Sequence, residues 1–360
     1  MFRKTYIGDY YSSPFCRYGG SFKSHNAIKL SAQTTKEWAD YKGVDVKKFD
    51  YVIYGNSVHQ DHGFWSGPWS AALLGAEKTP GIMISQACTT GLFSLFQSAT
   101  MIETDVYNNV YNLTSDRTSN GPVITWPDSM KKEVWVKDNF EWDPWGETSM
   151  IQTAERVREM FKISKEELDD CTVEKYEQYQ NAPERTYIFP TAGVDKDEGI
   201  KKISIERLRK LRRNNSHSVG NCTQPADGHT GIVVTSKKTD VKIISFAMSR
   251  VEKGYMPRAS IPASYTALRK ANLTIDDIKV INQHNAFAVN DIAFCKEFEL
   301  PTSKLNNWGS PLVYGHPQSP VLSRLAIEAI EETKTLGGGY CLVTGAAAGD
   351  LGAAMIFKVD

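Results

Sequence analysis

The sequence has no excess of charge of either sign, because its 360 residues include 42 lysine and arginine residues and 42 aspartate and glutamate residues. This balance argues against a general basic surface for nucleic acid or for an anionic membrane. The sequence also lacks any run near the roughly 18 apolar residues of a membrane span. Its first residues, MFRKTYIGDYY, contain no apolar leader. We therefore predict a soluble, cytoplasmic protein with neither nucleic acid nor membrane as a partner.

Cysteine is sparse and scattered, and no two cysteines form a C-x-x-C pair. The six cysteines are Cys16, Cys88, Cys171, Cys222, Cys295 and Cys341. A chain of this length can bury a large core without disulfides, so the pattern favours a reducing compartment and no zinc site within the chain. The stretch HQDHGFW contains His59 and His62 but no further spaced ligands. We therefore expect it to line a pocket or an interface rather than to hold a metal.

What the sequence does contain is an alternation of strand-like and helix-like segments, which is typical of an α/β protein. Residues 1–112 alternate in this way, and apolar strands resume at GIVVTS and VKIISFAMS. Between them, residues 113–219 are polar and rich in Trp, Asp and Lys, as expected of an inserted region. The sequence thus predicts one half from residues 1–112 plus 220–240, a second half from 241–360, and an inserted loop domain over 113–219.

Cys88 lies between GIMI, which has the character of a buried strand, and a segment with the apolar spacing of a helix. The intervening TTG predicts a tight turn. Such a turn places the sulfur at a helix N-terminus, where unpaired backbone N–H groups and the helix dipole favour a thiolate. A free cysteine is also a common packing residue, so this stretch alone leaves a nucleophile and a core residue both open.

Two histidines lie in short motifs far from Cys88 in the sequence. His284 lies in NQHNAFA and His316 in YGHPQSP. A cysteine with two histidines indicates an acyl-transfer site, because a neutral imidazole can take the thiol proton and an imidazolium can hold the thiolate. A histidine beside glycine and proline is more often a turn residue than a base, so spacing alone does not assign either one.

Several segments, in order, resemble the thiolases along most of the chain. ACTTGL is similar to the nucleophile turn C-x-S-G-L of that family, and TAERVREMFKISKEELD resembles its helix that begins T-A-E. VGNCTQPADG follows the pattern A-G-N-A-S-G-I-N-D-G. NAFA and GHP, with Arg324 eight residues after His316, match the C-terminal half. The chain is identified as a member of the thiolase superfamily, of the acetyl-CoA acyltransferase kind.

The resemblance implies an α/β thiolase fold, with two fused halves in a five-layer arrangement, an inserted loop domain and a homodimer. It also implies roles for five residues. Cys88 would be the acylated nucleophile, His316 its base, and His284 a group that holds a water or a thioester oxygen. Arg212 would lie near the phosphates of coenzyme A, and Thr223 beside its pantetheine arm. Coenzyme A would be a substrate, with no permanently bound cofactor and no metal.

The chain departs from the family pattern near its C-terminus. Thiolases usually carry C-x-G-G-G-x-G, whose cysteine moves the α-proton in the carbon–carbon step, but here the segment is VTGAAAGDLG. No cysteine lies between Val343 and Ala346, and Cys341 is expected in a strand core. G-H-P-x-G-x-S-G becomes GHPQSPVLS, which should reshape the pocket. Thiolases that lack the second cysteine include sterol-carrier-type and archaeal members, some of which work with a small zinc-ribbon/OB-fold subunit.

We therefore expect a thiolase-like acyltransferase that cleaves a β-ketoacyl-CoA with coenzyme A through an acyl-Cys88 thioester, or runs the reverse condensation. A bulky or carboxylated substrate such as benzoylsuccinyl-CoA would suit the altered pocket. Two alternatives remain open, a ketoacyl-synthase-like condensing enzyme and a non-catalytic scaffold subunit of an acyl-CoA complex. For the α-proton, His284 is the best candidate. The other possibility is that His284 only donates a hydrogen bond to the thioester oxygen while His316 serves both half-reactions.

Overall fold

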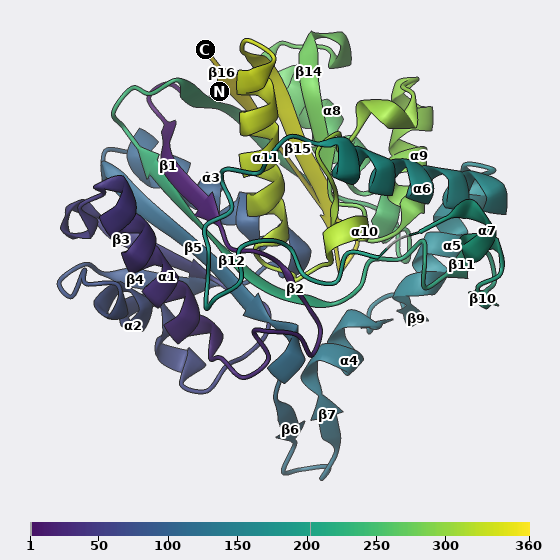
Figure 1. Cartoon of the computed structure of the whole chain (residues 1–360), viewed down its shortest axis with the longest axis horizontal. Coiled ribbons are helices and arrows are strands. Elements are labelled where there is room, and N and C mark those ends of the chain that lie inside the picture. The colour runs from purple at the N-terminus through teal and green to yellow at the C-terminus, as the bar shows by residue number, and fades with distance from the viewer. Residues whose placement is uncertain (1, 202) are drawn as a thin grey trace.

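The computed structural model describes residues 2–201 and 203–360. Its centre is a mixed sheet with the strand order β14-β15-β16-β13-β1-β12-β5-β3-β4 (Figure 1). The first half contributes β1 (Tyr6–Ser12), β3 (Tyr51–Gly55), β4 (Gly81–Ile84), β5 (Asn109–Arg117) and β12 (Ala226–Thr235). The second half contributes β13 (Val241–Arg250), β14 (Ile278–Gln283), β15 (Gly339–Ala347) and β16 (Leu351–Val359). A short strand, β2 (Cys16–Arg17), pairs with β12.

The two halves of the sheet meet between β1 and β13, where Tyr6 pairs with Lys242. In the first half, β3 runs parallel to β4 and β5, whereas β12 is antiparallel to β5 and β1. In the second half, β14 runs parallel to β15, and β16 is antiparallel to β15 and β13. Each half therefore combines parallel strands linked by helices with antiparallel strands, which accounts for the alternation in the sequence.

Helices form layers on both sides of each half-sheet. α3 (Thr90–Glu103) packs on β5 and β16, and α11 (Val321–Thr335) packs on β14, β15 and β1, so these two helices form the middle layer. α1 (Ala27–Lys42) and α2 (Ser66–Leu73) pack on the first half, and α8 (Ser260–Ala271) on β13 and β16. α11 is buried on nearly all sides, as an internal helix must be. The expected five layers of two α/β halves are confirmed.

A long excursion joins β5 to β12 outside the sheet. Because β5 continues to Arg117 and β12 begins at Ala226, it spans residues 118–225. A hairpin of β6 (Val123–Thr125) and β7 (Lys132–Val134) projects away from the body (Figure 1). The other elements are α4 (Trp135–Phe140), β8 (Trp142–Asp143), β9 (Thr148–Ser149), α5 (Met150–Met160), α6 (Lys165–Asn181), α7 (Ile205–Arg209), β10 (Arg213–Asn214) and β11 (His217–Ser218). α5 and α6 pack on α9 (Ala288–Phe298), so the excursion covers part of the second half.

Local sequence signals set the ends of these helices. α5 and α6 each begin with a capping box, formed by Ser149 with Gln152 and by Ser164 with Glu167. The remaining elements are α10 (Pro311–Tyr314) and the 3-10 turns Val46–Lys48, Gly63–Trp65, Ala87–Thr89, Thr118–Asn120, Met256–Arg258, Ile275–Asp277 and Thr302–Lys304. Within the described part of the chain, no helix combines the length and apolar character needed to cross a bilayer.

A buried ion cluster fastens the excursion to the middle layer. Arg324 of α11 donates to both carboxylate oxygens of Asp197, at 2.9 and 3.2 Å, and to Glu328 at 2.8 Å. The side chains of all three residues are fully buried. Tyr187 and Tyr314 donate to Glu328, so its carboxylate is further satisfied. Removal of one partner from such a cluster leaves an uncompensated buried charge, so these residues hold Asp197 of the excursion in place.

Candidate active site

Cys88 lies where the sequence predicts it, in a turn between a strand and a helix. β4 ends at Ile84, the 3-10 turn spans Ala87–Thr89, and α3 begins at Thr90. Ala87 has a φ of 46°, an uncommon conformation for a residue with a side chain. The Thr90 hydroxyl donates to the Ala87 carbonyl and accepts from the Gln86 N–H, at 2.6 and 2.8 Å. The threonine of ACTTGL thereby fixes the turn that presents the sulfur.

His316 faces this sulfur from a loop after α10. Its Nε2 lies 3.1 Å from Cys88 Sγ. The preceding Gly315 has a φ of 93°, and a Cβ there would lie 2.8 Å from Ala226 Cβ, so the GHP motif needs glycine at this position. The His316 N–H donates to the Gln224 carbonyl at 2.8 Å, which ties the loop to the segment before β12.

His284 follows the end of β14 and lies beside His316, with ring centroids 4.4 Å apart and the ring planes tilted by 47°. Its Nδ1 lies 3.1 Å from the carbonyl oxygen of Ala346. A carbonyl oxygen can only accept, so Nδ1 carries the proton and Nε2 of the neutral ring carries a lone pair. Nε2 is buried and has no partner in the described chain. His284 is therefore arranged to accept a proton or a hydrogen bond at Nε2, not to donate one.

Burial sets the protonation states of the three groups. It raises the pKa of Cys88 to about 12, although the N–H groups of Cys88 and Ala348 oppose the shift by bonding to the sulfur. Burial lowers the pKa of His284 to about 4. Burial also lowers the pKa of His316 well below its usual value, and the charge of His284 adds to this effect. Burial thus opposes the thiolate that the helix N-terminus was expected to favour, and it keeps the resting thiol protonated and the histidines neutral.

Gln318 is a group that the sequence analysis missed. Its side-chain carbonyl accepts from the Cys88 thiol at 3.1 Å, and its backbone N–H donates to His316 Nδ1 at 3.3 Å. This contact holds the His316 ring in the orientation that points Nε2 at the sulfur. Gln318 has a φ of 73° and lies inside the quoted GHPQSP motif. The motif could therefore have drawn attention to this residue, but the direction of its side chain depends on the fold.

The segment that matches the usual second cysteine forms part of β15. Positions 343–346 are Val, Thr, Gly and Ala, and all are buried. The Thr344 carbonyl accepts from the His284 N–H at 2.9 Å, and the Ala346 carbonyl contacts the His284 ring as described above. Cys341 is fully buried in the same strand, as expected of a core residue. The strand therefore positions His284.

The two residues expected at the coenzyme A site occupy different surroundings. Thr223 is half-buried, two residues before Pro225, which pairs with His316 in an isolated bridge. Its hydroxyl donates to the Pro311 carbonyl at 2.6 Å. Arg212 is exposed in the connection between α7 and β10, and it forms no hydrogen bond or ion pair among the described residues. The structure thus brings Thr223 close to the His316 loop and leaves Arg212 free at the surface.

The three side chains of this site also form a cluster that could hold a metal ion. Cys88, His284 and His316 each offer a ligand atom within 4.8 Å of the other two, whereas His59 and His62 belong to no such group.

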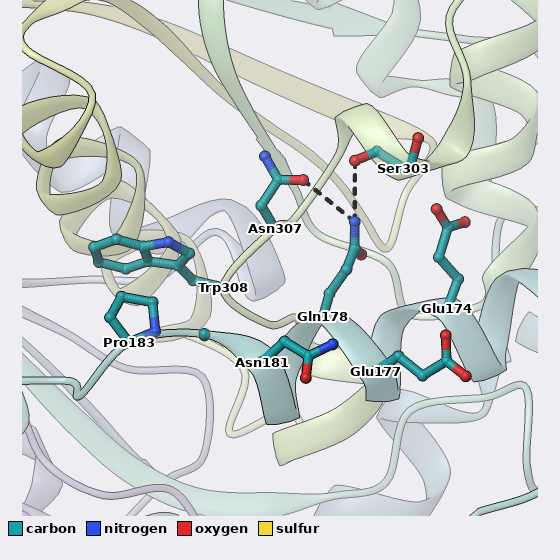
Figure 2. Close-up of a pocket in the computed structure, with 9 residues that line it drawn as sticks. Glu174, Glu177, Gln178, Asn181, Pro183, Ser303, Asn307 and Trp308 are labelled. Carbon is teal, nitrogen blue, oxygen red and sulfur yellow. Dashed lines mark hydrogen bonds between the residues drawn. The ribbon is translucent and has the colours of Figure 1, made fainter.

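A separate surface pocket lies between α6 and the residues after α9 (Figure 2). It is lined by Glu174, Glu177, Gln178, Asn181, Ala182, Pro183, Ser303, Asn307 and Trp308. Figure 2 shows Gln178 bonded to Ser303 and Asn307.

A cysteine at a strand-to-helix turn with two adjacent histidines in a five-layer α/β fold defines a protein built for acyl transfer through a cysteine. Comparison with known families identifies it further. The family descriptions "Thiolase, N-terminal domain" and "Thiolase, C-terminal domain" match residues 5–238 and 237–359. The chain belongs to the thiolase family, as its motifs predict.

Individual relatives agree with this assignment. The chain is similar to the human mitochondrial 3-ketoacyl-CoA thiolase (24% identity, 96% of each protein covered) and to the β-ketothiolase BktB of Cupriavidus necator (25%, 95% of each). Among solved structures, the human mitochondrial 3-ketoacyl-CoA thiolase superposes with a TM-score of 0.93 at 22% identity over 99% of both chains. Its complex with CoA gives 0.93 at 23%, over 99% of this chain and 98% of that one.

Proposed function

We propose that this protein is a thiolase that transfers an acyl group between a carbon atom and coenzyme A. It cleaves a β-ketoacyl-CoA with a second coenzyme A, or runs the reverse condensation, through a thioester on Cys88. The observation that carries the proposal is the contact of 3.1 Å between Cys88 Sγ and His316 Nε2 in a buried site. Thioester exchange at a cysteine requires this pair of groups and no redox cofactor.

In the direction of cleavage, the Cys88 sulfur attacks the β-keto carbon while the histidine pair takes the thiol proton. The bond between the α- and β-carbons then breaks, and the same proton reaches the α-carbon of the departing acetyl-CoA. Coenzyme A next attacks the acyl-cysteine, and its thiol proton passes through His316 to regenerate Cys88. No proton is gained or lost over the cycle, so the neutral resting state of the site suffices.

The negative charge that develops during both steps needs fixed hydrogen-bond donors. The backbone N–H groups of Cys88 and Ala348 act on the sulfur and lower the pKa of the thiol. We assign them to the oxygen of the tetrahedral intermediates, because such preorganised donors in a buried site commonly contribute a large share of the rate. His284 takes the α-proton in the condensing direction, since its Nε2 carries a lone pair. It thereby replaces the cysteine that thiolases usually carry near the C-terminus.

The remaining expectations stand as parts of the same proposal. Residues 1–112 plus 220–240 and residues 241–360 are the two halves, and residues 113–219 are the inserted loop domain. Thr223 contacts the pantetheine arm and Arg212 the phosphates, which the exposed position of Arg212 supports. A bulky or carboxylated acyl group fits the altered GHPQSP loop. We place the protein in the cytoplasm.

The first half of the sheet ends in an edge strand suited to pairing. Among the described strands, β4 pairs only with β3, and Ile82 and Met83 are 43% and 37% exposed. Phe64 and Trp65 nearby in the sequence are also exposed. An edge strand with exposed apolar side chains is a template for association, so we propose a homodimer through β4. A zinc-ribbon/OB-fold partner subunit is a further proposal, which rests on the resemblance to thiolases that lack the second cysteine.

A cleavage assay with matched variants tests this function. The purified protein is mixed with acetoacetyl-CoA, or a longer β-ketoacyl-CoA, and coenzyme A, and the acetyl-CoA produced is separated and quantified. We expect coenzyme A-dependent acetyl-CoA formation that Cys88→Ala abolishes and that the buried control Cys341→Ala retains. Activity of Cys88→Ala equal to that of the parent protein would exclude the acyl-cysteine route.

A further inference from the structure

Asp116 is a buried carboxylate that the mechanism above does not use. It lies on β5, is 1% exposed, and forms no ion pair among the described residues. Its oxygens accept instead from three backbone N–H groups, those of Ser57 and Val58 at 2.8 Å to Oδ1 and that of Ser319 at 2.8 Å to Oδ2. A lone buried charge is costly, so its retention indicates a task that a neutral residue does not perform.

Two of the donors, Ser57 and Val58, lie in the loop after β3, which contacts the nucleophile turn, and the third, Ser319, lies in the loop of His316. Ser57 follows β3, and its hydroxyl donates to the carbonyl of Ala87, the residue before Cys88, at 3.3 Å. Ser319 lies three residues after His316, and its hydroxyl donates to the Gly55 carbonyl at 3.1 Å. The carboxylate of Asp116 therefore joins the support of the nucleophile turn to the loop of the base.

We propose that ionised Asp116 is a positioning residue that holds His316 against Cys88, and that protonation of Asp116 releases the Ser319 loop and slows acylation. This inference rests on the proposed function, because acylation is the step it concerns. The surroundings of Asp116 consist of N–H donors, so a protonated carboxyl group there leaves one N–H without an acceptor. The titratable groups that feel its charge are Cys88 on the nucleophile turn and Tyr54 on β3.

The pH at which this change occurs follows from the balance of two effects. Burial raises the pKa of Asp116 to about 7, while the N–H groups of Ser319, Ser57 and Val58 hold it down. The pKa of Cys88 is about 12 and that of His284 about 4, so neither titrates in the same range. An acid limb of acylation near neutral pH therefore reports on Asp116.

Protonation of Asp116 has opposite effects on the stability of the fold and on the rate of Cys88 acylation. Because the folded pKa lies above the unfolded value, protonated Asp116 stabilises the fold at low pH, and that stabilisation is lost as pH rises through about 7. Acylation, in contrast, needs the ionised form and increases over the same range. A residue with a purely structural role would change the stability with pH without an opposite change in the acylation rate.

The test measures the rate of acylation of Cys88 by an acyl-CoA from about pH 5 to about pH 9, in the parent protein, Asp116→Asn and Asp116→Glu. Asp143→Asn is the control, since Asp143 is 2% exposed and accepts from the Trp145 N–H at 2.9 Å on β8, in the excursion and not in either loop. We expect an acid limb near pH 7 in the parent and the control. We expect Asp116→Asn to be slower by about 10- to 100-fold above that pH and to lack the limb, and Asp116→Glu to recover part of the rate.

The readouts separate the possible outcomes. Equal acylation rates of the parent and Asp116→Asn, or a parent profile without a limb, would overturn the inference and leave the proposed function standing. The absence of acylation in the parent would overturn both. The melting temperature of the parent relative to Asp116→Asn should fall as pH rises, and this comparison remains informative if the variant is less stable. A relative melting temperature that rises with pH would contradict the assigned protonation.

Discussion

The tautomer of His284 leads to a prediction about which half-reaction depends on it. With a pKa of about 4, only about one His284 in 10³ is protonated at neutral pH. A role as hydrogen-bond donor from Nε2 needs either this rare form or the other neutral tautomer, which loses the bond from Nδ1 to the Ala346 carbonyl, whereas a role as base uses the dominant form. We therefore expect His284→Ala to slow removal of the α-proton by about 10²–10⁴-fold, the usual contribution of one positioned base. Acylation of Cys88 by a simple acyl-CoA should change little.

Two assays on the same variant separate the steps. Rapid quenching with mass spectrometry gives the rate at which Cys88 is acylated, and exchange of the α-hydrogens of acetyl-CoA in heavy water gives the rate of proton removal. His316→Ala serves as the control, since it should slow both steps. If His284→Ala lowers both rates by the same factor, or leaves exchange unaffected, His284 is not the substitute for the missing cysteine. The α-proton would then have to be taken by His316, by a bound water or by the substrate.

Other predictions concern single features of the structure. The rate of Cys88 alkylation in the substrate-free protein should rise about tenfold per pH unit up to about pH 10, because its pKa is about 12; a plateau at neutral pH would mean a preformed thiolate. Zn²⁺ should inhibit and block this alkylation, because Cys88, His284 and His316 offer ligand atoms within 4.8 Å of one another, and inhibition that persists in His284→Ala would place the metal elsewhere. Arg324→Met should lower the free energy of unfolding by about 3–5 kcal/mol, since it leaves two buried carboxylates unpaired, and a loss under about 1 kcal/mol in denaturant titrations would contradict this. Ile82→Asp should convert a dimer to monomers in light scattering, and an unchanged mass would exclude β4 as the interface.

The sequence predicts the parts of the site that local patterns encode. The turn at Cys88 follows from a strand, a threonine pair and a helical spacing within a few residues, and the two histidines lie in short motifs that match the family. Protonation states are not local, because the pKa of Cys88 depends on the burial produced by segments far along the chain. A helix N-terminus favours a thiolate, whereas burial in the folded protein raises the pKa of Cys88 and favours the thiol.

Residues that are far apart in the sequence and meet only in the folded protein leave no local sequence pattern. Asp116 lies 59 positions from Ser57 and 203 from Ser319, so no spacing in the sequence links the three. Gln318 lies in the quoted motif GHPQSP, but the motif does not show where its side chain points. That direction depends on the folded backbone, in which Gln318 has a positive φ. The strand order, too, depends on pairings such as Tyr6 with Lys242 that no periodicity specifies.

The most direct test of the account is the identity of the residue that becomes acylated. The protein is incubated with a series of acyl-CoAs without a second substrate, quenched in acid and digested, and the adduct is located by mass spectrometry. We predict that the peptide that contains Cys88 gains the mass of the acyl group, and that free coenzyme A removes it again. An adduct on Cys222, Cys295 or Cys341 with Cys88 unmodified would contradict the assignment of the nucleophile and the mechanism built on it.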